Sequence, residues 1–110
     1  MMMKFHLDTI EENDVSKETN TRTKILAEAS DLINGQRAED YGPPAESFDT
    51  LAGLWSAYLG HSISITPSDA CNMLCLLKIS RMTKGRHHRD SAVDGAGYLA
   101  LGAECSEDEG

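Results

Sequence analysis

The stretch that decides the fold is residues 66–82, TPSDACNMLCLLKISRM. Thr66 is suited to the N-cap of a helix, Pro67 to its first position, and Asp69, three residues after the cap, makes an acidic variant of the capping box. Apolar residues then fall on most sides of the expected helix, which Gly85 should end. A helix that is apolar nearly all round lies at the centre of a domain or at a subunit interface, so we expect an oligomer.

Three more helices are predicted around this one. Apolar residues recur at helical spacing over about 23–34, from about Pro44 to Leu59, and over about 91–104. The segment 35–44, GQRAEDYGPP, is expected to be a loop because its glycines and prolines interrupt a helix. Every apolar segment longer than seven residues follows the 3.6-residue period, and none justifies a sheet. The pattern therefore predicts an all-α fold, a compact four-helix domain.

The same spacing predicts which side chains of these helices face inward. In the helix that starts near Pro44 they are Phe48, Leu51, Leu54, Trp55, Tyr58 and Leu59. In the last helix they are Val93, Ala96, Tyr98, Leu99 and Leu101. That helix also contains Gly95, Gly97 and Gly102. Glycine inside a helix usually means that another backbone or a ligand approaches closely.

A chain of 110 residues has the size of one domain. Residues 1–20 are polar, acidic and aperiodic, so we expect a flexible N-terminal arm there. A single helical domain is expected over 21–104, followed by a solvated acidic tail over 105–110.

The net charge of −8 disfavours duplex nucleic acid and anionic membranes as partners, because both favour a basic surface. The chain has neither an apolar run of about 20 residues nor a secretory signal, so we expect a soluble cytoplasmic protein. The cysteines show no metal-site spacing, and Cys71 and Cys75 are expected to be small buried hydrophobic residues.

Half of all lysines and arginines lie in residues 78–89, a stretch without any acid. Lys78 and Arg81 are three apart and share one face of their helix. Cationic side chains beside the start of the next helix can hold a phosphate, and the expected ligands are Lys78, Arg81, His88 and Arg89. The alternative is that Lys84 and Arg86 only complement the helix dipole and that the other cations are solvated.

Two further sets of residues are candidates for the same site. Asp90 and Asp94 are four apart on one helix face, a spacing at which carboxylates can hold Mg²⁺, although Ser91 and Asp94 could equally form a capping box. In the loop 35–44, the expected pocket residues over a base or sugar are Arg37, Asp40 and Tyr41. The alternative for Arg37 and Asp40 is a local ion pair.

The strings GQRAEDYGPP (35–44), LWSAYLG (54–60), TPSD (66–69), LKISR (77–81) and HRDSAVDGAGY (88–98) resemble a widespread phage and prophage domain of unknown function. The resemblance covers about residues 24–103. The order Asp-Tyr-Gly, Lys-x-x-Arg, Asp-x-x-x-Asp and Gly-Tyr is also similar to the nucleotide-modification-associated domain of phages, which in turn resembles the MazG-type all-α nucleoside-triphosphate pyrophosphatases. This resemblance implies a MazG-like helical bundle, usually oligomeric, that binds Mg²⁺ through acidic motifs on two helices, in the cytoplasm of an infected or lysogenic bacterial host.

The chain departs from the MazG pattern in its acidic motifs. Those enzymes carry Glu-Glu-x-x-Glu on one helix and Glu-x-x-Asp on another; the expected folded part has no Glu-Glu-x-x-Glu, and Asp90 and Asp94 are spaced one residue too widely. The resemblance therefore implies the fold and nucleotide binding more than hydrolysis, and an active enzyme would be a Mg²⁺-dependent nucleoside-triphosphate pyrophosphohydrolase.

Three functions remain open from the sequence. The first is a helical oligomer that binds a nucleotide or similar phosphorylated small molecule. The second is a non-catalytic phage counter-defence protein that sequesters a host nucleotide signal or inhibits a host protein. The third is a structural or interaction module without a small-molecule ligand.

Overall fold

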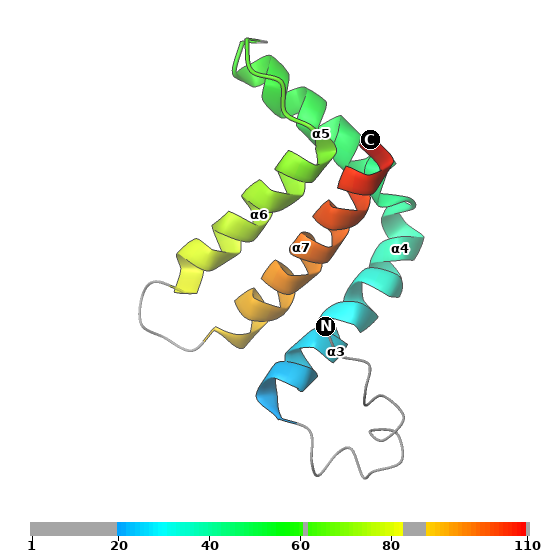
Figure 1. The fold of residues 1–110 in the computed structure, drawn as a ribbon, viewed down its shortest axis with the longest axis vertical. Helices are drawn as coiled ribbons and strands as arrows, with labels where there is room; N and C mark the ends of the chain where they lie inside the picture. The colour runs from blue at the N-terminus through cyan, green and yellow to red at the C-terminus, as the bar shows by residue number, and fades with distance from the viewer. Residues whose placement is uncertain (1–19, 61, 83–87, 110) are drawn as a thin grey trace.

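A computed structural model describes residues 20–60, 62–82 and 88–109 (Figure 1). These residues form helices and no strand: α3 (Thr21–Asn34), α4 (Gln36–Tyr41), α5 (Pro44–Tyr58), α6 (Pro67–Arg81) and α7 (Arg89–Glu109). The predicted all-α fold is confirmed for this part of the chain, with four long helices and one short one. None of the described helices is both long enough and apolar enough to cross a membrane.

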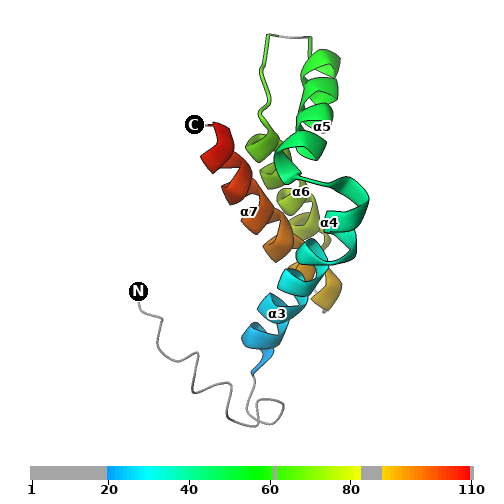
Figure 2. The same cartoon turned by 90° about the vertical axis from the view of Figure 1, so that its right-hand side faces the viewer.

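Helix α7, with 21 residues, is the central element and lies between α3 and α6 (Figure 1). Contacts of Ser68 with Glu109 and of Lys78 with Asp94 show that α6 and α7 are antiparallel. Helix α3 runs parallel to α7. Helix α5 crosses near the C-terminal end of α7, and its distal half extends beyond the other helices (Figures 1 and 2).

Glycines in α7 let its neighbours approach closely, as predicted. A Cβ atom added to Gly102 would lie 3.0 Å from Cys71 Cβ on α6, and one added to Gly97 would lie 3.0 Å from Ile33 Cγ2 on α3. Both distances are shorter than ordinary van der Waals contact. The two glycines therefore set how closely α6 and α3 pack on α7.

The start of α6 has the predicted capping box. Thr66 Oγ1 accepts a hydrogen bond from Asp69 N, and Asp69 Oδ2 accepts one from Thr66 N, each 3.1 Å long. The last described residue of α7 adds a second tie, because Ser68 N and Ser68 Oγ each donate a 2.9 Å bond to the Glu109 carboxylate. The two helices are thus joined at this end by side chains as well as by packing.

The buried core is small and contains two thiols. One cluster of buried residues within it consists of Phe48, Cys71, Leu101 and Cys105. All three cysteines are free and buried, as predicted for Cys71 and Cys75. Burial is the main reason that the pKa of Cys71 rises to about 12, with the neighbouring Cys105 thiol contributing. Burial raises the pKa of Cys105 as well, so these two thiols are neutral and act as small apolar side chains.

The loop predicted over 35–44 is wrong for most of its length. Gly35 ends α3 and the chain resumes helical geometry at once, so Gln36–Tyr41 form α4. A single glycine interrupts the hydrogen-bonding ladder without preventing a new turn directly after it. The chain thus ends a helix at Gly35, as predicted, and again at Gly42, whose φ of 73° lies in the left-handed region.

The predicted limits of the last helix are also wrong. Helix α7 begins at Arg89, so Ser91 is a buried residue of its first turn and makes no capping box with Asp94. It continues to Glu109, so residues 105–109 are helical; Cys105 is fully buried, whereas residues 106–109 are exposed, as expected for the acidic end. Residues 1–19, most of the predicted arm, lie outside the described residues, as does Gly85.

The predicted apolar faces are only partly correct. Phe48, Val93 and Leu101 are buried. Tyr58 is 88% exposed, and three other residues expected to face inward are also exposed: Leu54, Leu59 and Leu99. Helical spacing shows which residues share a face but not whether a neighbouring element covers that face.

Candidate functional site

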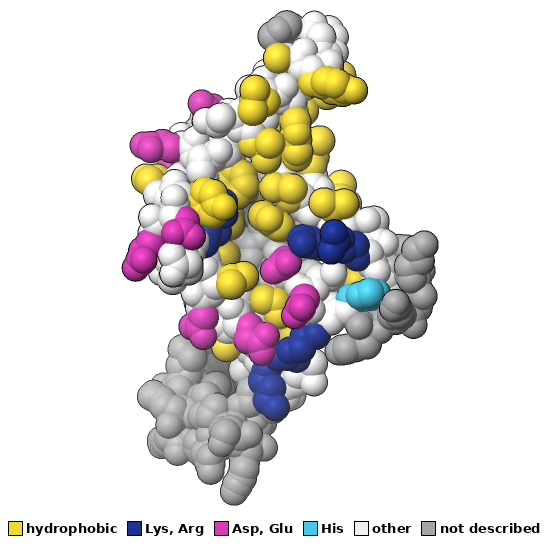
Figure 3. All heavy atoms as spheres, turned by 180° about the vertical axis from the view of Figure 1, so that it is seen from behind, with side chains coloured by type: hydrophobic (Ala, Val, Ile, Leu, Met, Phe, Trp, Pro, Cys, Tyr) yellow, Lys and Arg dark blue, Asp and Glu magenta, His cyan; other side chains and the backbone are white. Residues whose placement is uncertain are grey.

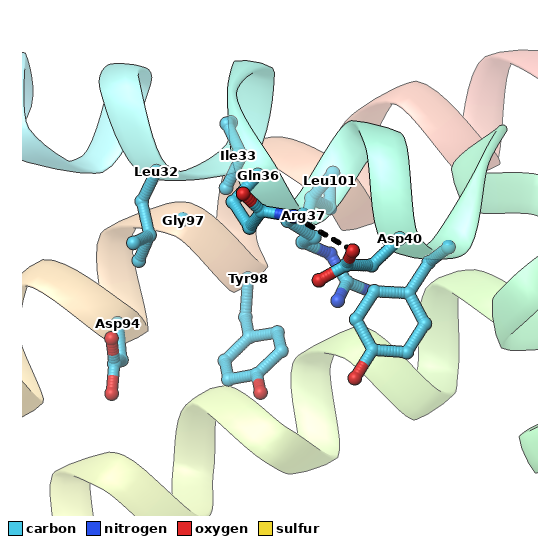
Figure 4. Close-up of a pocket in the computed structure, with 10 residues that line it drawn as sticks. Leu32, Ile33, Gln36, Arg37, Asp40, Asp94, Gly97, Tyr98 and Leu101 are labelled. Atoms are coloured by element: carbon cyan, nitrogen blue, oxygen red, sulfur yellow. Dashed lines mark hydrogen bonds between the residues drawn. The ribbon is translucent and has the colours of Figure 1, made fainter.

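Arg37 of α4 is held between two aromatic rings. Its guanidinium carbon lies 4.6 Å from the centre of the Tyr41 ring and 4.8 Å from that of Phe48. Cation–π contacts of this kind fix the guanidinium on the wall of the site. Asp40 accepts a 2.8 Å hydrogen bond from Gln36 Nε2 (Figure 4), and the described ion pairs do not include one between Arg37 and Asp40.

These residues open onto a cavity of about 290 Å³ between α3, α4 and α7. Asp94 lies at one end of the cavity and Arg37 with Asp40 at the other, with Tyr98 between them (Figure 4). The lining residues are Leu32, Ile33, Gln36, Arg37, Asp40, Tyr41, Asp94, Gly97, Tyr98 and Leu101. The structure thus brings the three α4 residues predicted for a pocket to one cavity, together with a carboxylate predicted for metal.

A second, acidic hollow adjoins the first and shares Leu32, Gln36 and Asp94 with it. Its volume is about 570 Å³, and four carboxylates line it: Glu28, Asp31, Asp90 and Asp94. Carboxylate oxygens are the ligands that Mg²⁺ prefers. However, no three metal-binding side chains of the described residues are arranged to hold one ion. The donor chemistry fits Mg²⁺, but the arrangement is not a preformed metal site.

Two of the predicted phosphate ligands are already paired with carboxylates. Lys78 Nζ lies 3.1 Å from Asp94 Oδ2, and both side chains are partly shielded from water. Arg89 forms an ion pair with Glu28 of α3. Acidic and basic side chains lie close together below the hydrophobic area of the face in Figure 3. The basic and acidic sites predicted separately are one mixed surface.

None of the four predicted phosphate ligands lines either hollow. Arg81 is exposed at the end of α6. His88 is half-buried just before α7, and its buried Nε2 has no hydrogen-bond partner among the described residues. Lys84, Arg86 and His87, which belong to the predicted basic stretch, lie outside the described residues.

Four residues with polar side chains line the hollows but were not predicted for a site: Glu28, Asp31, Gln36 and Tyr98. A signal for the first two was present, because acids three apart on α3 project from one helix face. Gln36 could not be assigned while its segment was expected to be a loop.

Comparison with known proteins gives a family match and two phage relatives. The profile of a family described as Domain of unknown function (DUF6378) matches residues 24–106. The "Gene 55 protein" of Mycobacterium phage L5 is 46% identical over 77 residues, covering 70% of this chain and 49% of the relative. The "Gene 55 protein" of Mycobacterium phage D29 is 46% identical over 74 residues, covering 67% and 48%. The chain thus spans about half the length of these curated relatives, and no solved structure matches it.

Proposed function

The chain belongs to the DUF6378 family, with relatives in phages, and we propose that it binds a nucleotide or a similar phosphorylated small molecule between α3, α4 and α7. The observation that carries this proposal is the cavity that joins Arg37, Asp40 and Tyr41 to Asp94, the carboxylate that pairs with Lys78. The cavity thus joins residues suited to a planar ring to a carboxylate whose partner, Lys78, is suited to a phosphate although it does not line the cavity.

The α4 end of the cavity suits a base or sugar. Tyr41 and Tyr98 offer aromatic surface, and Asp40 with Gln36 offers hydrogen-bond acceptors and donors. Small-molecule sites usually measure about 300–1,000 Å³, so a cavity of about 290 Å³ is at the small end of that range. Its size favours one nucleoside unit over a dinucleotide.

The α7 end suits the phosphates. A phosphate would compete with Asp94 for Lys78, and Arg81 lies one turn further along α6. Asp90 and Asp94 would hold Mg²⁺, which would supply positive charge to offset that of the carboxylates and of a bound phosphate. Binding does not by itself imply hydrolysis here, because the described carboxylates do not converge on one ion.

A second candidate is the Mg²⁺-dependent pyrophosphohydrolase that the MazG resemblance implies. It is favoured by one observation: acidic residues from two helices, Glu28 and Asp31 on α3 and Asp90 and Asp94 on α7, line the same hollow. Sequestration of a host nucleotide signal needs the same binding without turnover. The two functions therefore differ only in whether the ligand is hydrolysed.

The test is a thermal-shift screen of a nucleotide panel with and without Mg²⁺, followed by chromatography of each stabilising compound. The Tyr41→Ala variant should weaken binding of a stabilising nucleotide by roughly tenfold, since base–aromatic stacking is worth about 1–3 kcal/mol. Leu26→Ala removes an exposed side chain from α3, outside both hollows, and should leave affinity unchanged. The proposed site would be rejected if no nucleotide raised the unfolding temperature, or if both variants lost the same amount of nucleotide affinity.

A further inference from the structure

Charged residues are nearly absent from one long segment of the chain. Residues 50–77 contain a single charged side chain, Asp69, although Asp, Glu, Lys and Arg make up 25% of the protein. The segment covers the distal half of α5, the connection to α6 and most of α6. A soluble monomer would be expected to carry charges on the outward sides of such helices.

The outward sides carry large apolar groups instead. Figure 3 shows hydrophobic side chains gathered over the upper half of one face, towards α5. The exposed apolar residues of α5, the connection and α6 are Leu54, Tyr58, Leu59, Ile63, Met73, Leu76, Leu77 and Ile79, which we call the uncharged surface. Exposed apolar patches of this kind mark interaction sites.

Within residues 20–60, 62–82 and 88–109, no other helix covers this surface. Helix α6 packs on α7 through Cys71 and Cys75, while Met73 and Leu76 lie on the opposite side of the same helix and stay exposed. The distal part of α5 projects past the other helices in both views (Figures 1 and 2). Tyr58, near the end of this projection, is 88% exposed.

We propose that the uncharged surface is the interface between two copies of this chain. The distribution of charge favours this surface for contact between two copies. Each copy has a net charge of −8, so two copies repel each other wherever acidic faces meet. They can approach most easily through the segment that has almost no charges. The cores of known interfaces are likewise depleted of charged residues.

Shape and size agree with a second copy. In a two-fold pair the same patch is used by both partners, so the projecting α5 of each copy can lie along the exposed side of the partner's α6. A standard interface uses about 20–30 residues on each side. Helices α5 and α6 have 15 residues each, so with their connection they can present a patch of that order. This pairing does not depend on the proposed ligand site.

The experiment is sedimentation velocity across the micromolar range on the full chain. The wild type should be a dimer. Leu76→Asp should weaken the dimer by roughly ten- to a hundredfold, because a charge then enters a symmetric interface twice. Tyr58→Ser gives a second variant, since a side chain that is 88% exposed contributes little to the folding of one copy.

Leu26→Asp is the matched control. Leu26 and Leu76 are both 62% exposed leucines within helices, but Leu26 lies on α3, outside the uncharged surface. The control should dimerise like the wild type, and circular dichroism should show all variants to be helical. A wild type that stays monomeric, including one that binds only another protein, overturns the proposal. So does a dimer that Leu76→Asp and Tyr58→Ser leave intact.

Discussion

Among single residues, Lys78 and Asp94 belong to both parts of the proposed site, because they form an ion pair with each other. It links α6 to α7 at 3.1 Å, yet its two members were predicted for different ligands, phosphate and metal. If the pair has only a structural role, removing it should change stability alone. If it also binds a ligand, removing it should change nucleotide affinity as well.

We predict that Lys78→Met and Asp94→Asn are coupled in stability by about 0.5–1 kcal/mol, as expected for a partly shielded pair. A double-mutant cycle by urea unfolding measures this coupling. Lys78→Met should also lower nucleotide affinity about ten- to a hundredfold, whereas Lys24→Met on the exposed start of α3 should not. Stability coupling with unchanged affinity would assign the pair to structure alone.

The Cys71 thiol gives a prediction in alkaline solution. Its pKa is raised from 9.0 to about 12 in the folded protein, mainly by burial, so the native state holds this proton more tightly than the unfolded chain does. The resulting stabilisation is complete below pH 9 and is lost as the pH rises from about 9 to about 12. The free energy of unfolding should fall by up to about 1.4 kcal/mol per pH unit for this proton.

Urea unfolding at a series of pH values measures this loss, and Cys71→Ala is the comparison, because it removes the group while other alkaline titrations remain. The variant should show a shallower decline above pH 9. Parallel curves for the two proteins would contradict a strongly raised Cys71 pKa.

The residue types of the candidate site could be found from the sequence, but their partners could not. Arg37, Asp40 and Tyr41 stand out because they are close together in a short segment. The pairs Lys78–Asp94 and Arg89–Glu28 join different helices, so nothing in local spacing indicates them. Their positions depend on the packing register of α7 against α6 and α3.

Among the elements, α6 was the most predictable because its start is specified locally. The Thr66–Asp69 capping box and Pro67 need no tertiary contact, and the structure has all of them. The limits of α7 were less predictable. Its acidic end continues as helix because Cys105 packs in the core and Glu109 accepts hydrogen bonds from Ser68 at the start of α6. Both contacts join residues that are distant in the sequence, so local spacing does not indicate them.

The glycines of α7 test whether close helix packing outweighs helix propensity. Gly102→Ala should destabilise the protein by about 1–3 kcal/mol, because its Cβ would lie 3.0 Å from Cys71 Cβ and 3.5 Å from the Ser68 carbonyl oxygen. Gly53→Ala is the matched control in α5, where no atom lies within 4 Å, and should gain up to about 1 kcal/mol from propensity. Thermal unfolding of both variants measures the contrast, and a stabilised Gly102→Ala protein would show that α6 and α7 can separate without cost.

For the whole molecule, helical periodicity predicts the fold class well and the distribution of buried surface poorly. The core contains Phe48 and Leu101 but is otherwise largely alanine and cysteine, whereas several leucines predicted to be internal are exposed. Periodicity cannot distinguish a face covered by the same chain from one covered by another copy. That ambiguity falls on α5 and α6, where the uncharged surface lies.

Ionic strength separates the proposed dimer from one held by ion pairs. Two copies with a charge of −8 repel each other at long range, and salt screens this repulsion, with a Debye length of about 10 Å at 0.1 M. The contact itself is apolar and contains few ion pairs that salt could weaken.

Raising the concentration of sodium chloride should therefore tighten the dimer, whereas an interface held by pairs between acidic and basic side chains should weaken. Sedimentation equilibrium at low and high salt measures the sign of the effect, and Leu26→Asp should follow the wild type because its charge lies outside the contact. If the dimer dissociates as salt is added, the interface lies on the mixed charged face and not on the uncharged surface.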